Sequence, residues 1–149
     1  MARVVLTGCR MASGTGESSI VVGLDLVLIS AITSSIGHFG ARFLRRIFTP
    51  GEIGYCLLDP DASAMRFAAR FAAKEAALKV LRFEDEAVSW RSIEIERSSR
   101  GAPALLLHNE ARARALDGEF IGFSVSLTHE GDYASAVVIG ERRLPGRNE

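Results

Sequence analysis

The pattern of apolar and polar positions divides the chain into a buried first strand, a helical middle and a second half of short strands. Residues 20–29 (IVVGLDLVLI) are almost all apolar and β-forming, which predicts a buried strand. Asp25 interrupts this run. Because strand side chains alternate between faces, it shares one face with Gly23 and Val27. A small residue beside a carboxylate leaves room on that face for another group to approach.

The middle of the chain has the features of helices. Residues 31–47 are predicted to form a helical region that is broken at its central glycines. Thr49, Pro50 and Glu52 match the N-cap, first and third positions of a new helix. Residues 62–82 are rich in alanine, leucine and arginine and contain no glycine or proline, which predicts a long helix.

Beyond residue 90 the pattern changes to the period of two that is typical of strands. Strands are predicted at residues 90–97, 104–107, 121–128 and 133–139. Asn109 is expected to cap a helix that runs to Asp117, and residues 129–132 to form a hairpin turn. This order predicts an α+β domain in which an antiparallel sheet packs on a long helix.

The composition fits one folded domain. The chain has 149 residues, of which 48% are hydrophobic, and this excludes an intrinsically disordered protein. We expect a domain at residues 20–141, a disordered extension at 1–19 and a tail at 142–149. The net charge of zero gives no overall field that would point to nucleic acid or an anionic membrane.

The cysteines and the hydropathy suggest a cytoplasmic protein. Cys9 and Cys56 make no disulfide framework, and no apolar run is long enough for a transmembrane helix. Residues 6–9 (LTGC) spell a lipoprotein-type processing site, but the apolar stretch before them is shorter than a signal needs. Cys56 is expected to be a buried core thiol.

Candidate chemistry lies on the first strand and the long helix. A lone acid such as Asp25 inside an apolar strand is costly unless it is paired or bound to a metal. Glu75 and Lys79 are four residues apart and therefore share one helix face. Two interpretations remain open. In the first, Asp25 is structural and Glu75 and Lys79 form an exposed pair; in the second, Asp25 and Glu75 hold one magnesium ion and Lys79 meets phosphate charge.

The last hairpin carries a second polar group. Ser124, Ser126 and Thr128 share one face of a predicted strand, and His129 follows directly. His129 is either a surface residue of the turn or part of a polar pocket rim for a phosphorylated ligand. The chain contains no glycine-rich phosphate loop and no zinc-ligand pattern.

Four segments, GLDLVLI, RFLRRIFTPGEIGYC, FAARFAAKEAALK and SVSLTHEGDYASAVVI, resemble in sequence and in order the holo-acyl-carrier-protein synthases. These enzymes are the small single-domain class of 4′-phosphopantetheinyl transferases. The resemblance implies transfer of the 4′-phosphopantetheine arm of coenzyme A to a serine of an apo acyl carrier protein, with release of adenosine 3′,5′-bisphosphate. It also implies magnesium dependence, a role in fatty-acid and lipid biosynthesis, and a homotrimer with active sites between subunits.

The resemblance further implies roles for individual residues, by motif position. Asp25 and Glu75 would be the magnesium ligands, and Glu75 and Lys79 would be catalytic. Glu75, directly or through a metal-bound water, would accept the serine proton. The implied coenzyme A contacts are Arg70, Lys74, Lys79, Gly101, Pro103, Thr128 and His129.

The sequence departs from the family after Asp25. Leu28 and Ala31 stand where the family usually has an acid and an arginine that docks the carrier protein. Arg42, Arg45 and Arg46 are the alternative docking patch, since steering by charge depends on the patch more than on one residue. The turn at residues 59–63 is acidic where some relatives have basic residues for the 3′-phosphate, so other arginines are expected to bind coenzyme A.

Two further functions stay open at this point. One is a degenerate, non-catalytic homologue that binds coenzyme A or a carrier protein. The other is a different small phosphate-handling enzyme that shares only the metal pair. The sequence also leaves open whether the carrier belongs to fatty-acid synthesis, polyketide synthesis or another pathway.

Overall fold

A computed structural model describes residues 18–83 and 88–144 of the chain. Residues 1–17 of the extension expected at 1–19, and the end of the tail from residue 145, lie outside the described residues. Residues 18 and 19 were expected to be disordered, but they belong to the first strand. The elements, in chain order, are β1 (Ser18–Leu28), α1 (Ile29–Ile47), α2 (Pro50–Leu57), α3 (Pro60–Leu81), a 3-10 turn (Trp90–Ser92), β2 (Ile93–Arg97), β3 (Pro103–Leu107), α4 (Asn109–Asp117), β4 (Phe120–Glu130) and β5 (Tyr133–Arg143).

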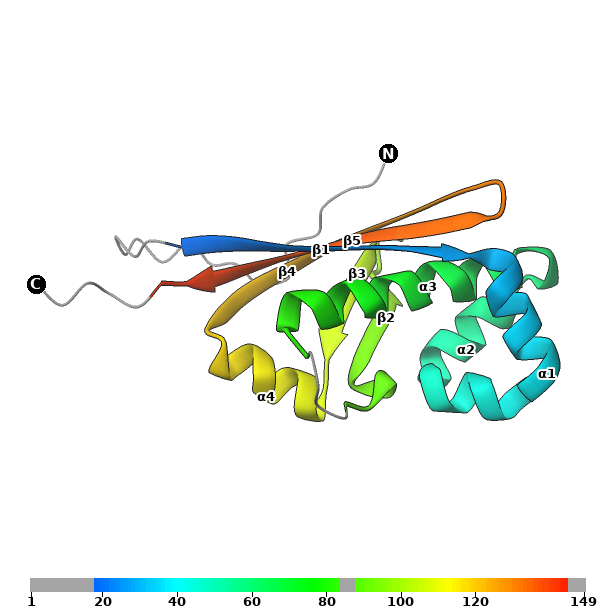
Figure 1. The fold of residues 1–149 in the computed structure, drawn as a ribbon, viewed down its shortest axis with the longest axis horizontal. Coiled ribbons are helices and arrows are strands. Elements are labelled where there is room, and N and C mark those ends of the chain that lie inside the picture. The colour runs from blue at the N-terminus through cyan, green and yellow to red at the C-terminus, as the bar shows by residue number, and fades with distance from the viewer. Residues whose placement is uncertain (1–17, 84–87, 145–149) are drawn as a thin grey trace, which may run out of the picture.

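The strands form two antiparallel sheets, which confirms the α+β prediction. β1, β5 and β4 make a three-stranded sheet in that order, with β1 at an edge, and β2 pairs with β3. α3 runs along one face of the three-stranded sheet, with α1 and α2 at one end and α4 at the other (Figure 1). Within the described residues, no helix is both long enough and apolar enough to cross a membrane.

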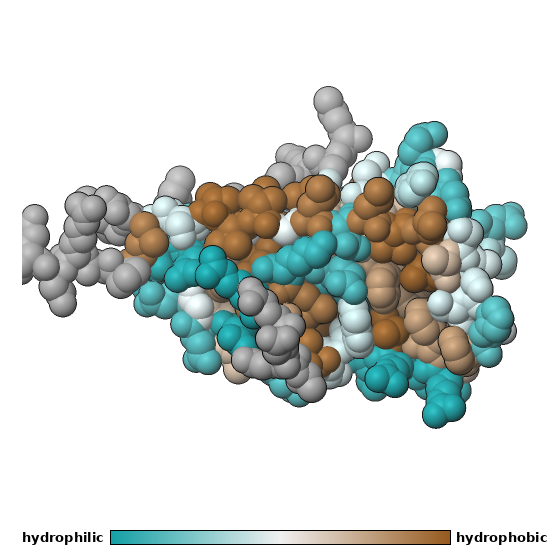
Figure 2. Space-filling view, viewed as in Figure 1, coloured by the Kyte–Doolittle hydropathy of each residue, from teal (hydrophilic) through white to brown (hydrophobic). Residues whose placement is uncertain are grey.

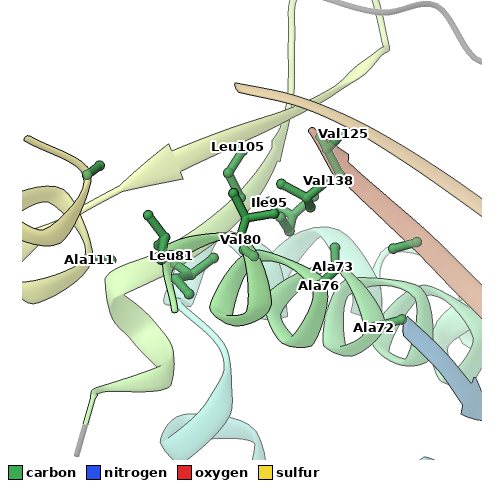
Figure 3. Packing of buried hydrophobic residues seen from close by; sticks show 14 residues of the cluster. Ala72, Ala73, Ala76, Val80, Leu81, Ile95, Leu105, Ala111, Val125 and Val138 are labelled. Atoms are coloured by element: carbon green, nitrogen blue, oxygen red, sulfur yellow. The ribbon is translucent and has the colours of Figure 1, made fainter. Parts of the chain in front are cut away.

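The core forms where α3 meets the sheets. Alanines cover the buried side of α3, so the helix backbone comes close to the strands, and Val80, Val125 and Val138 fill the space between (Figure 3). The closest approach is at Gly23, where an added Cβ would lie 2.1 Å from the carbonyl oxygen of Ala76. The room predicted beside Asp25 is thus taken by α3 itself, and glycine is the residue that permits it.

The sequence correctly predicted the start of α2, the break in α1 and the burial of Cys56. Thr49 and Glu52 form the predicted reciprocal cap of α2, with Pro50 at its first position. α1 is interrupted as predicted, at Gly40, which has a φ of 54° and is free of the Cβ that disfavours this region in other residues. Cys56 is fully buried, and burial raises the pKa of its thiol to about 11, so it is the inert core residue that was predicted.

Several predicted boundaries are wrong by a few residues. The β1–β5 ladder continues to the pair Ser18 and Arg143, so the first residues of the predicted tail belong to β5. The predicted strand 90–97 begins with a 3-10 turn. His108, not Asn109, is the N-cap of α4. The two strands of the last hairpin run to Glu130 and from Tyr133, so its turn is two residues long instead of four.

The face of β1 that points away from α3 is apolar and exposed. Its side chains are between 43% and 62% exposed, and they are Ile20, Val22, Leu24, Leu26 and Leu28. In the β1–β5 register Val137 and Ile139 extend this face onto β5. Figure 2 shows apolar surface along the line of β1. We call this surface the outer face of the sheet; monomeric soluble proteins seldom expose a patch of this kind.

Candidate active site

Asp25, Glu75 and Lys79 come together where the edge strand β1 lies against α3. The Nζ of Lys79 donates to Asp25 Oδ1 at 2.9 Å and to the carbonyl of Leu24 at 2.7 Å. Burial and then the negative charge of Asp25 raise the pKa of Glu75, while Lys79 acts in the opposite direction. Asp25, the acid inside the apolar first strand, is therefore paired with Lys79 of the long helix, and the carboxylate of Glu75 lies close by.

This pair of carboxylates has the donor chemistry that magnesium needs. In the part of the chain that the structure describes, no group of three or more histidine, cysteine, aspartate or glutamate residues is placed to hold a metal. Magnesium differs from zinc or calcium because it is commonly held by one or two carboxylates, several waters and the phosphates of a substrate. Asp25 and Glu75 fit such a shared site.

Lys74 lies on a different side of α3 and is occupied inside the protein. Its side chain is 0% exposed, and its Nζ lies 2.9 Å from Glu52 Oε2. The same nitrogen donates to the carbonyls of Trp90, at 3.0 Å, and Ile93. Burial lowers the pKa of Lys74, and the charge of Glu52 opposes that shift. The expected contact between Lys74 and coenzyme A is not supported, because a fully buried ammonium with three acceptors has no hydrogen left to donate.

Arg70 belongs to a cluster of three arginines around Tyr55. The guanidinium carbon of Arg70 is 4.2 Å from the centre of the Tyr55 ring, and those of Arg66 and Arg97 are 4.9 and 5.4 Å away. Arg70 is 4% exposed, and its Nε has no hydrogen-bond partner among the described residues. Asp59 pairs with Arg66 at 3.6 Å. The cluster carries excess positive charge, which suits an anionic ligand.

Sequence reasoning missed most of this cluster. The spacing of Arg66 and Arg70, four apart on the long helix, was the available signal for that pair. Nothing local pointed to Arg97, which ends β2 and whose Nη1 donates to the hydroxyl of Tyr55 on α2 at 3.0 Å. The Nε of Arg97 donates to the carbonyl of Gly101 at 3.0 Å, so the predicted glycine turn joins the arginine cluster.

The other expected coenzyme A contacts come from the turn before β3 and from the end of β4. Pro103 opens β3, directly after the turn that contains Gly101. Thr128 and His129 are exposed near the end of β4. In the sheet register Thr128 pairs with Ser135, which pairs with Leu26, so Thr128 belongs to the outer face and Asp25 to the face against α3.

The expected docking arginines follow the break in α1 and are exposed. Arg42 and Arg46 line a shallow pocket together with Phe39 and Phe43. Arg45 is not among its lining residues; its Nε donates to the carbonyl of Ala41 at 3.3 Å. The structure thus groups two of the three arginines with aromatic rings.

Comparisons with known proteins identify the family. Residues 21–138 match the family model described as the 4′-phosphopantetheinyl transferase superfamily. The holo-[acyl-carrier-protein] synthase of Herpetosiphon aurantiacus is 41% identical over 128 residues, which cover 81% of this chain and 98% of that protein. The synthase of the same name from Moorella thermoacetica is 44% identical over 121 residues, or 80% of this chain and 91% of its own.

A solved structure agrees with these sequence matches. The crystal structure of the Helicobacter pylori holo-[acyl-carrier-protein] synthase in complex with coenzyme A superposes with a TM-score of 0.70 at 29% identity. It covers 80% of this chain and 99% of the other. The family model spans most of the chain, the carboxylate pair lies on the matched segments, and the chain belongs to the holo-[acyl-carrier-protein] synthases of the 4′-phosphopantetheinyl transferase superfamily.

Proposed function

We propose that the chain transfers the 4′-phosphopantetheine arm of coenzyme A to a serine of an apo acyl carrier protein, with a magnesium ion held by Asp25 and Glu75. Family membership supports the donor and the acceptor, because the relatives are named holo-[acyl-carrier-protein] synthases and one of them is a complex with coenzyme A. The observation that carries the proposal is the pairing of Asp25 with Lys79 beside Glu75 at an open edge of the sheet.

The chain's own residues supply most of the chemistry. A bound magnesium ion would neutralise pyrophosphate charge that develops as the bond breaks. Lys79 is 52% exposed on a flexible stem, so its ammonium can leave Asp25 for a phosphate oxygen. The serine oxygen forms a bond to the proximal phosphorus, and the bond to the bridging oxygen breaks to release adenosine 3′,5′-bisphosphate. Glu75 is the proposed acceptor of the serine proton, directly or through a water.

The arginine cluster is the proposed site for the 3′-phosphate of coenzyme A. Arg66, Arg70 and Arg97 gather on one ring, and the guanidinium fork is suited to bidentate contacts with phosphate. Arg66 and Arg97 are the more exposed members of the cluster and would make the phosphate contacts, with Arg70 adding charge from behind. This cluster replaces the basic residues that some relatives carry in the turn that is acidic here.

An Arg97→Gln variant tests this function and this site together. We expect the KM for coenzyme A to rise about tenfold, the size of one lost charge-assisted hydrogen bond. The KM for dephospho-coenzyme A, which lacks the 3′-phosphate, should change little. The assay is steady-state conversion of an apo acyl carrier protein. Arg100→Gln, an exposed arginine of the neighbouring turn, is the matched control. An equal rise in KM for both donors would show that the cluster does not bind the 3′-phosphate. If the unaltered chain converts no carrier protein, the proposed function is wrong.

The proposed assembly is a homotrimer in which each active site draws on two subunits. The outer face of the sheet is the apolar surface that neighbouring copies would bury. Thr128 lies on that face, away from Asp25 of its own chain, and His129 follows it at the exposed end of the hairpin. Assembly across the outer face would bring the end of the hairpin that carries Thr128 and His129 to the coenzyme A held by the carboxylates of a neighbour.

The carrier protein is proposed to dock beside the break in α1. Arg42 and Arg46 supply positive charge for an acidic partner, and Phe39, which is 64% exposed, supplies an apolar contact. This pairing compensates for Ala31, which replaces the arginine that the family usually has. We place the reaction in the cytoplasm, in the supply of active carrier for fatty-acid synthesis.

A further inference from the structure

We infer that Lys74 and its buried partner Glu52 are positioning residues that set the distance between the two metal-binding carboxylates. The inference rests on the proposed function, because it assigns a role to Lys74 in placing Glu75 opposite Asp25. Neither Lys74 nor Glu52 reaches the reacting groups, since their side chains are 0% and 1% exposed.

The first support is the completeness of the contacts at the ion pair. Lys74 uses its three N–H groups on Glu52, Trp90 and Ile93. Glu52 in turn accepts from the backbone N–H of Ile95 at 3.0 Å and of Thr49 at 2.8 Å. The pair therefore joins α3 to α2, the 3-10 turn and β2 through directional bonds. A side chain held by three acceptors has one orientation, and the helix turn that carries it is fixed with it.

The second support lies on the other side of Glu75. The next residue, Ala76, presents its carbonyl to Gly23 of β1, where an added Cβ would come within 2.1 Å. Gly23 is two residues before Asp25 on the same face of that strand. Residues 74 and 76 are thus fixed against two different parts of the fold, and Glu75 is held between them. Its position relative to Asp25 follows from these two contacts.

The third support is that a buried ion pair contributes little to the stability of the fold, so stability alone does not explain its presence. Desolvation of two charges offsets much of their attraction, and well-packed apolar replacements of buried pairs are often neutral or stabilising. An apolar pair would fill the volume but would leave α3 free to rotate or slide slightly. At an active site a displacement of about 1 Å can cost roughly 100-fold in rate, so fixing the helix matters more for Glu75 than for the core.

The test uses calorimetric titration of coenzyme A at increasing magnesium concentrations, together with transfer kinetics. Two variants are compared with the unaltered protein. Glu52→Asp keeps both charges but shortens the link, and the double variant E52Q/K74M removes both charges. We expect both to fold and to need about tenfold more magnesium for half-maximal coenzyme A binding. The KM for the carrier protein should be unchanged.

A matched control separates positioning from general loss of stability. Leu81→Val alters another buried residue of α3, two helical turns beyond Lys74, and it should leave the magnesium requirement unchanged. Unchanged magnesium dependence in folded Glu52→Asp would overturn the inference even where the double variant fails to fold. If the unaltered protein shows no magnesium-dependent binding of coenzyme A, the proposed function fails instead.

Discussion

Replacing Glu75 with glutamine will abolish transfer and at the same time stabilise the folded protein near neutral pH. The loss of activity should be roughly 10³-fold or more, because the change removes a proposed magnesium ligand and the proposed acceptor of the serine proton together. The gain in stability follows from the environment of Glu75, in which burial and the charge of Asp25 disfavour the ionised carboxylate.

The sign of the pH dependence follows from the raised pKa. The folded state holds the Glu75 proton more tightly than the unfolded chain, so the ionisation of Glu75 lowers the free energy of unfolding as pH rises through the folded pKa. In magnesium-free buffer Glu75→Gln should therefore raise the Tm at pH 7, and the gain should vanish below the ordinary pKa of glutamate. Differential scanning calorimetry across this range measures it.

Glu110→Gln, at an exposed glutamate in the first turn of α4, is the control for the loss of one charge. A transfer rate of Glu75→Gln close to that of the unaltered protein would show that Glu75 has no role in the mechanism. A gain in Tm that stays the same below the ordinary pKa of glutamate would show instead that ionisation of Glu75 does not destabilise the fold.

A charge placed on the outer face of the sheet will break the assembly and the activity together. Val22 is 60% exposed in the single chain and points away from α3, so Val22→Glu should leave each subunit folded. Buried in a subunit interface, an unpaired glutamate is costly, and we expect dissociation from trimer to monomer. Light scattering after size exclusion gives the mass, and the transfer assay gives the rate.

Leu58→Glu is the matched control, because Leu58 is 76% exposed and lies outside the sheet. It should change neither mass nor rate. Mixing also tests the shared site: Glu75→Gln and His129→Ala chains are each weak alone, and together they should regain activity in mixed trimers. A monomeric Val22→Glu protein with full activity would contradict a site built from two subunits.

The sequence predicted best what is decided locally. The cap at Thr49 and Glu52 and the break at Gly40 depend on neighbouring residues, and the structure contains both. The strand boundaries were predicted less well, because the ends of β1 and β5 are set by pairing with each other. The continuous apolar run of β1 predicted burial on both faces, yet one chain buries only one of them, which itself indicates a partner.

The two lysines of the chain show where sequence reasoning about the site reached its limit. Both lie in the motif of the long helix, which favoured a role beside coenzyme A for each. Lys79 does contact Asp25, but Lys74, five residues earlier, faces Glu52 in the interior. Arg97 escaped notice because the fold alone brings it to Tyr55. Residue type and spacing identify which side chains carry chemistry, and the packing of α3 decides which of them reach the ligand.

The most direct test of the whole account is intact-mass spectrometry of a panel of apo acyl carrier proteins. Each carrier is incubated with the chain and coenzyme A, with and without magnesium. The account predicts that at least one carrier gains the phosphopantetheine arm, with an equal amount of adenosine 3′,5′-bisphosphate, and that omission of magnesium prevents the gain. No gain on any carrier, while coenzyme A still binds, would contradict it and identify the chain as a binding homologue without transferase activity.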